Sequence, residues 1–470
     1  MASGPFRRTR SDGRSRRFAL VSVLVALAVV LAGCSAVFGP DETEGRIAPP
    51  TDHASGDPAD DALGWEGGYW YDDAISITHG DGYNESERAA LVNRTMARVE
   101  QIRGLEFERP VPVEVISREE YRENRSGGGG DATYQAWNDQ VWEGLFIVPE
   151  GTGSSDSFDD TLGQSVLGYY SPGEESIVLV SDSPTPQVSN ATLAHELVHA
   201  LQDQQFDLGG SPDTQDRQLA RSSVIEGEAN FVESVYTDRC GDVWSCLPEP
   251  ESGSGGGSGG DFNRGLYLTI YTPYSAGQSF IESIYDDGAW GAVSDLHDRK
   301  PESTEQVIHP DRYPDEDPVN VTVPDRSSDE WSRFDHDPVA DTVGEASIYA
   351  MFVDNRVVSV SAADFYAYES TPSEGWAGDS LVPYTDGDGD EEDAYVWETR
   401  WDSTSDAREF ASAYRDLLRS HDADSKGSNV FVVPESDAYG DAFRVVREGQ
   451  TVRVVNAPTR DQLGAVHERE

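Results

Sequence analysis

Lysine is almost absent from this 470-residue chain. It occurs only at Lys300 and Lys426, and 35 basic residues in total face 87 acidic ones, which gives a formal net charge of −52. A surface this acidic repels the phosphate backbone of nucleic acids, so the composition excludes nucleic-acid binding. It also repels itself in dilute buffer, whereas molar salt shortens the screening length to about 3 Å. The charge therefore predicts adaptation to a hypersaline medium and indicates habitat more than function.

Cysteine is also scarce, with three residues in the chain. Cys240 and Cys246 are separated by five residues, and in an oxidising compartment they could close a small loop through a disulfide. A loop this short stabilises a fold only modestly, by about 2 kcal/mol. A two-cysteine metal site is the alternative, although no histidine lies close to the pair in the sequence.

Long apolar runs are absent after residue 40. The one such run, residues 18–33, follows six arginines and ends in Leu-Ala-Gly-Cys34. It is shorter than the roughly 20 residues that span a bilayer, so the pattern predicts a signal peptide over residues 1–33 that ends in a lipobox. Cys34 would carry the lipid, and the rest of the chain would lie at the cell surface, extracellular and anchored to the cytoplasmic membrane. An uncleaved N-terminal anchor is the alternative and gives the same topology.

The rest of the chain is long enough for two or three domains. Residues 34–64 are rich in Pro, Gly, Asp and Ala, which predicts a disordered tether. Residues 251–261 are predicted to form a Gly/Ser linker. We expect an N-terminal lobe over 65–250, a mainly helical lobe over 262–372 and a small α+β module over 373–470. The clearest periodic segments are a helix over 85–103, a hairpin over 167–170 and 177–180, C-terminal strands over 395–399, 430–433, 443–447 and 451–455, and a C-terminal helix over 407–418.

One segment, Thr192-Leu-Ala-His195-Glu196-Leu-Val-His199-Ala-Leu201, has a recognisable chemistry. Residues four apart lie on one face of a helix, so His195 and His199 can offer two imidazole nitrogens to one metal ion. Glu196 lies one step around the turn, where its carboxylate can act as a general base on water without binding the metal. The pattern is typical of zinc hydrolases, and the alternative is a buried helix with two core histidines.

A catalytic zinc ion needs a third protein ligand and one open position. A second helix is predicted over 222–233, and Glu226 is our choice because it follows Val-Ile directly and would face the core. Glu228 is the alternative ligand. It lies about 200° around the helix from Glu226, so the two carboxylates cannot reach the same ion. Either glutamate could instead solvate a surface.

Three further residues are candidates for supporting roles. His309 could donate a hydrogen bond to the oxyanion that develops when water attacks a carbonyl, and a capping or core role is the alternative. Histidines that bind zinc usually donate their other ring N–H to an acceptor. We expect Asp203 and Asn230 to be these partners, from their proximity on the two helices.

The two helices together resemble the gluzincin metallopeptidases, in which the glutamate of a Glu-Gly-x-Ala helix is the third zinc ligand. Over roughly residues 160–420 the chain also resembles a largely uncharacterised family of predicted surface metallopeptidases whose haloarchaeal members are lipoproteins. The matching segments are His195–Leu208, Glu226–Ala229, Pro273–Phe280, Ser303–Pro310, Gly375–Asp379 and Trp401–Phe410. The resemblance implies an α+β fold with a zincin-like metallopeptidase core and a metal site, but no particular substrate.

We therefore expect an extracellular, lipid-anchored zinc metallopeptidase in which His195, His199 and Glu226 hold the metal and Glu196 is the general base. Zinc is the expected cofactor, a peptide or protein the expected substrate, and a monomer the expected state. The alternative is a non-catalytic surface binding lipoprotein that retains a metallopeptidase fold. The intact Glu196 argues against it, because a scaffold has no need of that carboxylate beside two histidines.

Overall fold

The structure is a computed structural model that describes residues 47–48, 50, 53, 56–59, 61–77, 82–125, 131–162, 166–210, 212–248, 250, 262–386 and 393–468. The expected signal peptide with Cys34, much of the expected tether and the expected Gly/Ser linker lie outside these residues. Among the residues described, no helix combines the length and the apolar character that crossing a bilayer requires.

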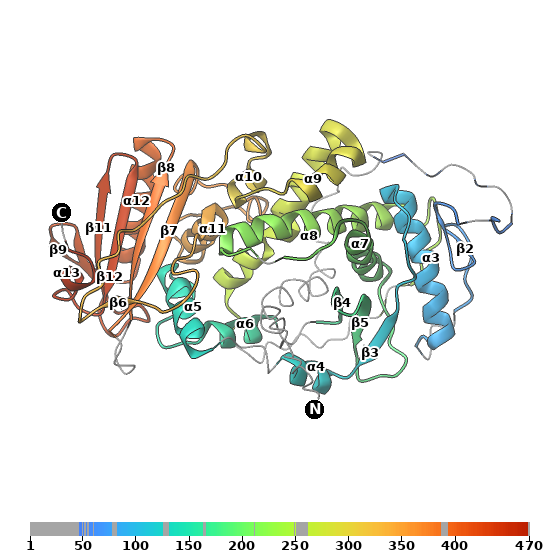
Figure 1. Ribbon diagram of the computed structural model, residues 1–470, viewed down its shortest axis with the longest axis horizontal. Helices are drawn as coiled ribbons and strands as arrows, with labels where there is room; N and C mark the ends of the chain where they lie inside the picture. The colour runs from blue at the N-terminus through green and yellow to red at the C-terminus, as the bar shows by residue number, and fades with distance from the viewer. Residues whose placement is uncertain are drawn as a thin grey trace, which may run out of the picture.

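The described chain is mixed α and β, in agreement with the expected α+β class, and is elongated, with helices between two β regions (Figure 1). A small three-stranded sheet has the order β3-β5-β4, in which β3 is parallel and β4 antiparallel to β5. Its strands are β3 (Val113–Ile116), β4 (Gly168–Ser171) and β5 (Ser176–Val180), and a separate hairpin joins β1 (Trp65–Glu66) to β2 (Tyr69–Trp70). The hairpin expected upstream of the histidine helix is therefore present as β4 and β5.

The described helices that precede β7 along the chain are α3 (Glu85–Arg103), α4 (Arg118–Arg125), α5 (Ala132–Gly144), α6 (Ser154–Leu162), α7 (Asn190–Phe206), α8 (Gln215–Asp238), α9 (Arg264–Asp298), α10 (Thr304–Ile308), η2 (Pro310–Arg312) and α11 (Gly344–Asp354). The helix α3 has the bounds expected from its apolar spacing. It begins at a capping box formed by Asn84 and Glu87, and ends at Gly104 in the left-handed conformation that glycine adopts without strain.

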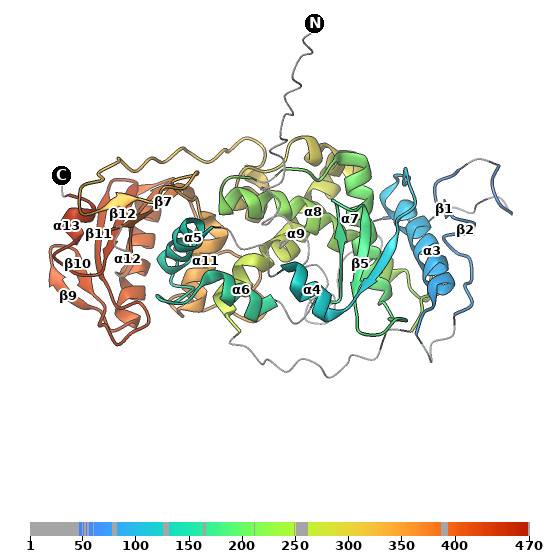
Figure 2. The same cartoon turned by 60° about the horizontal axis from the view of Figure 1, so that its bottom comes forward.

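The C-terminal region forms an antiparallel seven-stranded sheet in the order β6-β7-β8-β12-β11-β10-β9. Its elements are β6 (Ser332–Arg333), β7 (Trp376–Thr385), β8 (Ala394–Trp401), α12 (Thr404–Ser420), β9 (Asp424–Gly427), β10 (Val430–Val432), β11 (Ala442–Glu448), β12 (Thr451–Ala457) and α13 (Leu463–Val466). Helix α13 lies on the outer face of the sheet, and α12 on the face towards α5 and α11 (Figure 2). The sheet takes in β6, which lies upstream of the module expected from residue 373.

Asp379 fastens this sheet to the helical region. Its buried carboxylate accepts hydrogen bonds from the indole N–H groups of Trp376 and Trp397, at 3.0 Å each. It also accepts the backbone N–H groups of Val343 and Gly344, where α11 begins. One carboxylate thus joins strands β7 and β8 to a helix N-terminus, where negative charge is favourable.

The expected lobes share one hydrophobic core. A single cluster of buried side chains runs from Met96 in α3 through Leu197 in α7 and Phe280 in α9 to Trp397 in β8. The helices α8 and α9 lie side by side, although the expected linker separates them in sequence (Figure 1).

Two glycines allow α8 and α9 to approach closely. A Cβ atom added to Gly227 would lie 2.3 Å from the carbonyl oxygen of Gly277, and one added to Gly277 would lie 2.7 Å from that of Ser223. No side chain fits at such distances, because the obstructing atoms belong to the backbone. The contact fixes α9 beside the turn of α8 that contains Glu226 and Glu228.

We predict that Gly227→Ala lowers the free energy of unfolding by about 1 to 3 kcal/mol, because the new methyl group forces α8 and α9 apart. Gly291→Ala is the matched control: this helical glycine of α9 has open space around its Cβ position. There the greater helix propensity of alanine should stabilise the protein by about 0.5 to 1 kcal/mol. Denaturant unfolding at constant salt measures both changes, and equal effects of the two substitutions would contradict the close-packing account.

Candidate metal centre

The histidine helix α7 begins with a side-chain cap and is buried over most of its length. Ser189 Oγ accepts the backbone N–H of Thr192, which satisfies one of the free N–H groups at the helix start. From Thr192 to Gln202 every residue is buried. The imidazoles of His195 and His199 therefore project into the protein interior, from one face of the helix, as their spacing predicts.

Three side chains converge at this point. The Nε2 atoms of His195 and His199 each lie 3.3 Å from Oε2 of Glu226 on α8, and the three potential ligand atoms lie within 4.8 Å of one another. The three residues are at most 2% exposed. The structure thus brings together the three side chains that the sequence predicts to be metal ligands.

Glu228, the alternative ligand, points elsewhere. Its buried carboxylate forms an ion pair with Arg103 of α3, and its Oε2 lies 2.7 Å from Nε2 of His297 on α9. The two-residue offset from Glu226 turns it to another face of α8, as helix geometry requires. The expectation that it solvates a surface is also wrong, because the group is buried and paired.

The outer nitrogens of the histidines have partners other than those we expected. Glu233 Oε2 lies 3.1 Å from Nδ1 of His195, and Gln202 Oε1 lies 3.0 Å from Nδ1 of His199. Both acceptors place the ring proton on Nδ1, which leaves Nε2 directed at the centre. The spacing of these residues could have predicted both contacts. Gln202 follows His199 by three residues, and Glu233 follows Glu226 by seven, so each pair lies on one face of its helix.

The residues expected in these positions bind other groups. Asp203 Oδ2 accepts the hydroxyl hydrogen of Tyr170 at 2.8 Å, and Asn230 donates to the backbone carbonyl of Tyr274 at 2.7 Å. They fasten α7 to β4 and α8 to α9, so they support the surroundings of the centre and not its histidines.

Glu196 lies beside the converging groups, and its two oxygens differ. Oε2 accepts the backbone N–H of Tyr170 in β4 at 2.7 Å. Oε1 is buried and has no hydrogen-bond partner among the described residues, whereas Nε2 of His199 makes the 3.3 Å ion contact with Glu226 Oε2. Buried polar atoms without protein partners are rare, and they commonly contact a bound ion or a water molecule. This arrangement therefore fits a metal centre with a neighbouring base.

The charges of the centre compensate one another. Burial lowers the pKa of His195, but its hydrogen bonds with Glu226 and Glu233 outweigh this and raise it to about 10. Burial raises the pKa of Glu226, but the two histidines lower it to about 2. Burial raises the pKa of Glu196. A metal ion held by the imidazoles would take the place of their Nε2 protons, so metal and proton compete for this site.

Tyr274 is a member of the centre that sequence reasoning missed. Its buried phenol, from α9, makes a hydrogen bond with Glu226, and its ring lies 6.5 Å from that of His195 between centroids. Burial, followed by the charges of Glu226 and Glu196, raises the pKa of Tyr274 well above its usual value, so the phenol remains a neutral donor. Tyr274 belongs to the segment Pro273–Phe280, and the resemblance of this segment to other proteins could have pointed to it.

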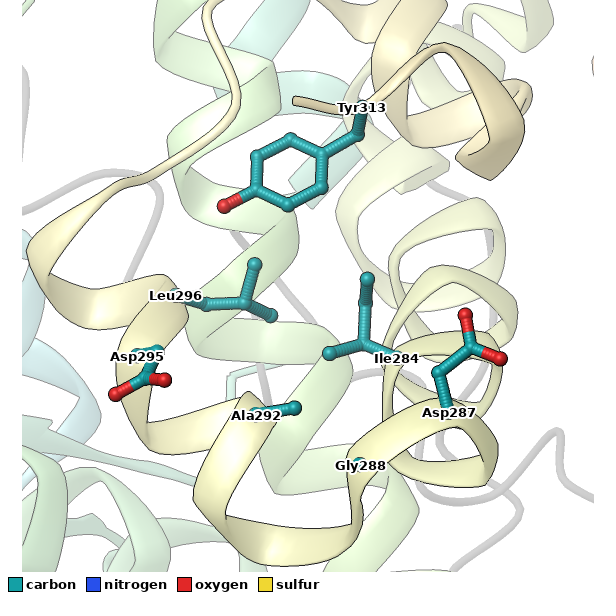
Figure 3. Close-up of a pocket in the computed structure, with 7 residues that line it drawn as sticks. All are labelled: Ile284, Asp287, Gly288, Ala292, Asp295, Leu296 and Tyr313. Carbon is teal, nitrogen blue, oxygen red and sulfur yellow. The ribbon is translucent and has the colours of Figure 1, made fainter. Parts of the chain in front are cut away.

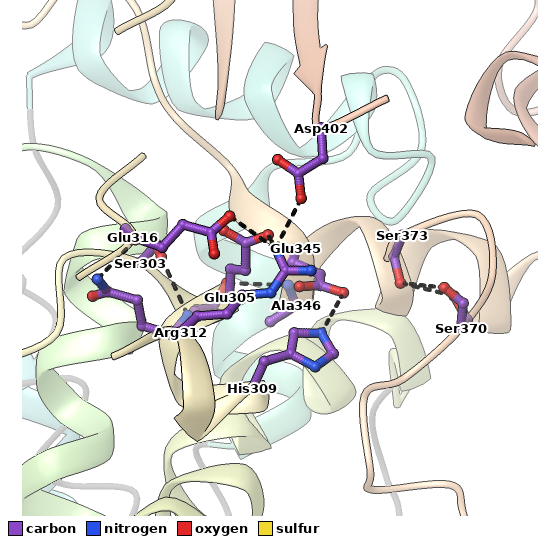
Figure 4. Close-up of polar contacts among 12 residues, drawn as sticks. Ser303, Glu305, His309, Arg312, Glu316, Glu345, Ala346, Ser370, Ser373 and Asp402 are labelled. Carbon is purple, nitrogen blue, oxygen red and sulfur yellow. Dashed lines mark hydrogen bonds and ion pairs between the residues drawn. The ribbon is translucent and has the colours of Figure 1, made fainter. Parts of the chain in front are cut away.

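The structure does not bring His309 to the centre. It ends α10, and its Nε2 lies 3.2 Å from Oε1 of the buried Glu345 (Figure 4). This is the capping or core role that we gave as the alternative.

A second group of acids lies near His309 and already has a cation. The carboxylates of Glu305, Glu316 and Asp402 surround Arg312, which contacts Glu316 at 3.5 Å and Asp402 at 3.1 Å and also pairs with Glu305 (Figure 4). The guanidinium group satisfies these carboxylates, so their proximity requires no metal ion. The contact with Asp402 joins η2 to the C-terminal sheet.

The two remaining cysteines form a disulfide, Cys240–Cys246, in the segment that follows α8. Around it, Arg98 of α3 donates to the carbonyl of Ser245 and to the hydroxyl of Tyr236. The bridge therefore closes a short loop that α3 holds against the end of the Glu226 helix.

Comparisons with known proteins concern the C-terminal region. A family model described as a domain of unknown function, DUF8575, matches residues 332–467. This segment runs from β6 to α13 and contains the whole seven-stranded sheet, but none of the residues of the centre. No curated protein and no solved structure matches the chain.

We predict that Glu233→Ala weakens zinc binding about 10- to 100-fold, because His195 loses the acceptor that orients its ring. Competition with a chromophoric chelator at fixed salt measures the affinity. Glu119→Ala, which removes an exposed carboxylate of α4, is the control for the change in net charge and should leave the affinity unchanged. Wild-type affinity in the Glu233 variant would show that this carboxylate does not support the ligand.

Proposed function

We propose that the protein is a zinc-dependent peptidase. The observation that supports this most strongly is the convergence of His195, His199 and Glu226, with the carboxylate of Glu196 alongside. Two imidazoles and one carboxylate are a known ligand set of catalytic zinc sites, which keep a further position for water or substrate. Calcium and magnesium prefer oxygen ligands alone, so this donor set favours zinc.

Each residue of the centre has a separate role in the proposed peptide hydrolysis. When bound, zinc supplies a Lewis acid that lowers the pKa of water and polarises a carbonyl oxygen. Glu196 takes a proton from the attacking water at Oε1 and delivers it to the leaving amine. The Tyr170 N–H holds the other oxygen and so fixes the orientation of the base. Tyr274 holds Glu226 through its phenol.

A peptide substrate is supported by the position of β4. This strand lies at the edge of the small sheet, and its Tyr170 contacts the general base directly. An extended peptide can add to the edge of a sheet as a further strand, through backbone hydrogen bonds with the edge strand. We propose this mode for the substrate here.

We further propose that the peptidase works as a monomer at the cell surface, anchored through a lipid on Cys34. The support is the signal-peptide pattern and lipobox of the sequence. The Cys240–Cys246 disulfide is in keeping with an oxidising exterior compartment.

A non-catalytic binding protein is the second candidate, and one observation favours it. His195, Glu196 and His199 are at most 1% exposed, whereas a substrate must reach the centre. Cleavage of a peptide library with and without a chelator separates the two candidates. Cleavage that the chelator abolishes supports the peptidase, and a zinc-loaded protein that cleaves no peptide supports the binding protein.

We predict that Glu196→Gln retains zinc at the wild-type stoichiometry but lowers peptide hydrolysis at least 100-fold, because the amide cannot accept the proton of water. Glu119→Gln, at an exposed position of α4, makes the same chemical change away from the centre and should keep full activity. Zinc content and turnover are measured on the same preparations. Unchanged turnover in Glu196→Gln would contradict the proposed mechanism.

A further inference from the structure

A cavity of about 500 Å³ lies between the start of α8, the end of α9 and the segment that follows α9. Tyr313 lines both this cavity and a smaller one of about 260 Å³ in the bend of α9, where the side chains of Ile284, Ala292 and Leu296 gather below the tyrosine ring (Figure 3). The smaller cavity is largely apolar at its centre, whereas the larger one has mainly charged walls.

The larger cavity concentrates positive charge in a protein that has little of it. Four cationic side chains line it: Arg217 and Arg221 from α8, and Arg299 and Lys300 after α9. The chain has 35 basic residues against 87 acidic ones, and Lys300 is one of two lysines. Such a composition favours scattered cations within an acidic surface, so four of them around one cavity are unexpected.

The acids of the cavity compensate these charges only in part. Glu302 pairs with Arg217 at 2.7 Å and contacts Arg221 at 3.4 Å. Lys300 donates to the backbone carbonyl of His297, and Arg299 to that of Pro314. Asp298 and Asp317 also line the cavity, but in the described part of the chain neither forms an ion pair with the four cations.

Two nitrogen atoms of the cavity residues lack partners. Nε of Arg221 and Nδ1 of His297 are buried without a hydrogen bond from the described residues. The His297 side chain is 1% exposed and stacks on Phe206, with its other nitrogen on Glu228. Burial, and then the charge of Arg221, lower the pKa of Lys300, and the charges of Asp298 and Asp207 offset this only in part.

We propose that this cavity binds a small organic oxyanion, either a carboxylate or a phosphate ester, through Arg217, Arg221 and Lys300. Guanidinium groups bind such oxyanions in a forked geometry, and an ammonium group adds a point charge. The volume is typical of sites for small organic ligands, and far exceeds the roughly 30 Å³ share of a single water molecule. The rings of Tyr313 and Pro314 in the wall offer contact to the organic part.

The cavity is also connected to the candidate metal centre by a chain of contacts. His297 Nε2 lies 2.7 Å from Glu228 Oε2, Gln202 donates to the same oxygen at 2.9 Å, and Gln202 Oε1 lies 3.0 Å from Nδ1 of His199. An oxyanion that moves His297 would therefore act on a side chain that orients a metal ligand. This second part of the proposal rests on the proposed function, whereas the binding of the oxyanion does not.

Calorimetric titration of the full-length, chelator-treated protein at constant molar salt tests the binding without zinc. The probes are acetylglycine, glycerol phosphate and inorganic phosphate, with acetylglycinamide as the uncharged analogue. We expect one of the two organic oxyanions to bind with a stoichiometry of one. The probe that binds more tightly shows whether the site prefers a carboxylate or a phosphate ester. Binding of inorganic phosphate alone, or equal binding of acetylglycinamide, would overturn the proposal.

Arg221→Gln and Lys300→Gln should each weaken this binding at least tenfold. Lys426→Gln is the matched control, because Lys426 is the other lysine and pairs with Asp424 on the exposed strand β9. It should bind like the wild type. Arg221 and Lys300 are partly exposed, so both variants should keep the wild-type melting temperature. Equal affinity of wild type and Arg221→Gln, or equal losses in all three variants, would also overturn the site.

Zinc affinity with and without saturating oxyanion tests the connection. We expect at least a threefold change, and by linkage zinc must change the oxyanion affinity by the same factor. An unchanged zinc affinity overturns the connection but not the oxyanion site. Absence of zinc binding overturns the proposed function. The titration of the chelator-treated protein still shows whether the cavity binds an oxyanion.

Discussion

The carboxylate of Glu226 is 2% exposed and lies between two imidazoles, and the helices α7, α8 and α9 pack around it. An isolated buried carboxylate is costly, because it loses its hydration without compensation. His195 and His199 compensate it from α7, and Tyr274 adds a hydrogen bond from α9. Three helices must therefore meet at one point. The glycine contact between α8 and α9 makes this possible, since Gly227 follows Glu226 directly.

The same stretch of α8 lies between the candidate metal centre and a buried ion-pair network. On one side Glu226 faces the histidines, and on another Glu228 forms a buried network with Arg103 and His297. Gln202 contacts both sides, since it binds His199 through its oxygen and Glu228 through its nitrogen. The side chain that orients a proposed metal ligand is thus held in turn by a carboxylate of an ion pair outside the candidate centre. Breaking a buried ion pair of this kind typically costs about 3 to 5 kcal/mol.

The C-terminal sheet shares one hydrophobic core with the helical region. Asp379 caps α11 while binding two tryptophans of the sheet, and Arg312 bridges η2 to Asp402. Arg312 lies outside the region matched by the DUF8575 model and therefore links it to η2, whereas the contacts of Asp379 join α11 to the sheet within that region. Its sheet supports the helical region that borders the proposed oxyanion cavity, through α10, η2 and α11.

Features that depend on one helix or one hairpin were predictable from the sequence. The i, i+4 spacing of His195 and His199 fixes their common face, and the apolar spacing of α3 gave its bounds. The choice of Glu226 rested on its position directly after Val-Ile, and the 100° step of the helix showed only that Glu226 and Glu228 cannot reach the same ion. Strand β7 was not expected, because a strand buried on both faces lacks the alternation that signals a half-exposed one.

Contacts between distant segments were not predictable in this way. Tyr274 approaches Glu226 only because α9 packs against α8, and Glu228 is buried because Arg103 and His297 reach it from two other helices. Asp203 lies on the histidine helix α7, but the hydroxyl of Tyr170 in β4 binds it. Such pairings depend on how the elements pack, which the local pattern of one segment does not contain.

Zinc stoichiometry tests the central claim most directly. Metal analysis of the wild type, His199→Ala and His309→Ala, each purified at high salt and loaded with zinc, compares a histidine inside the proposed centre with one outside it. The account predicts one zinc ion per chain in the wild type and in His309→Ala, and none in His199→Ala. A wild type without bound zinc, or full occupancy in His199→Ala, would contradict it.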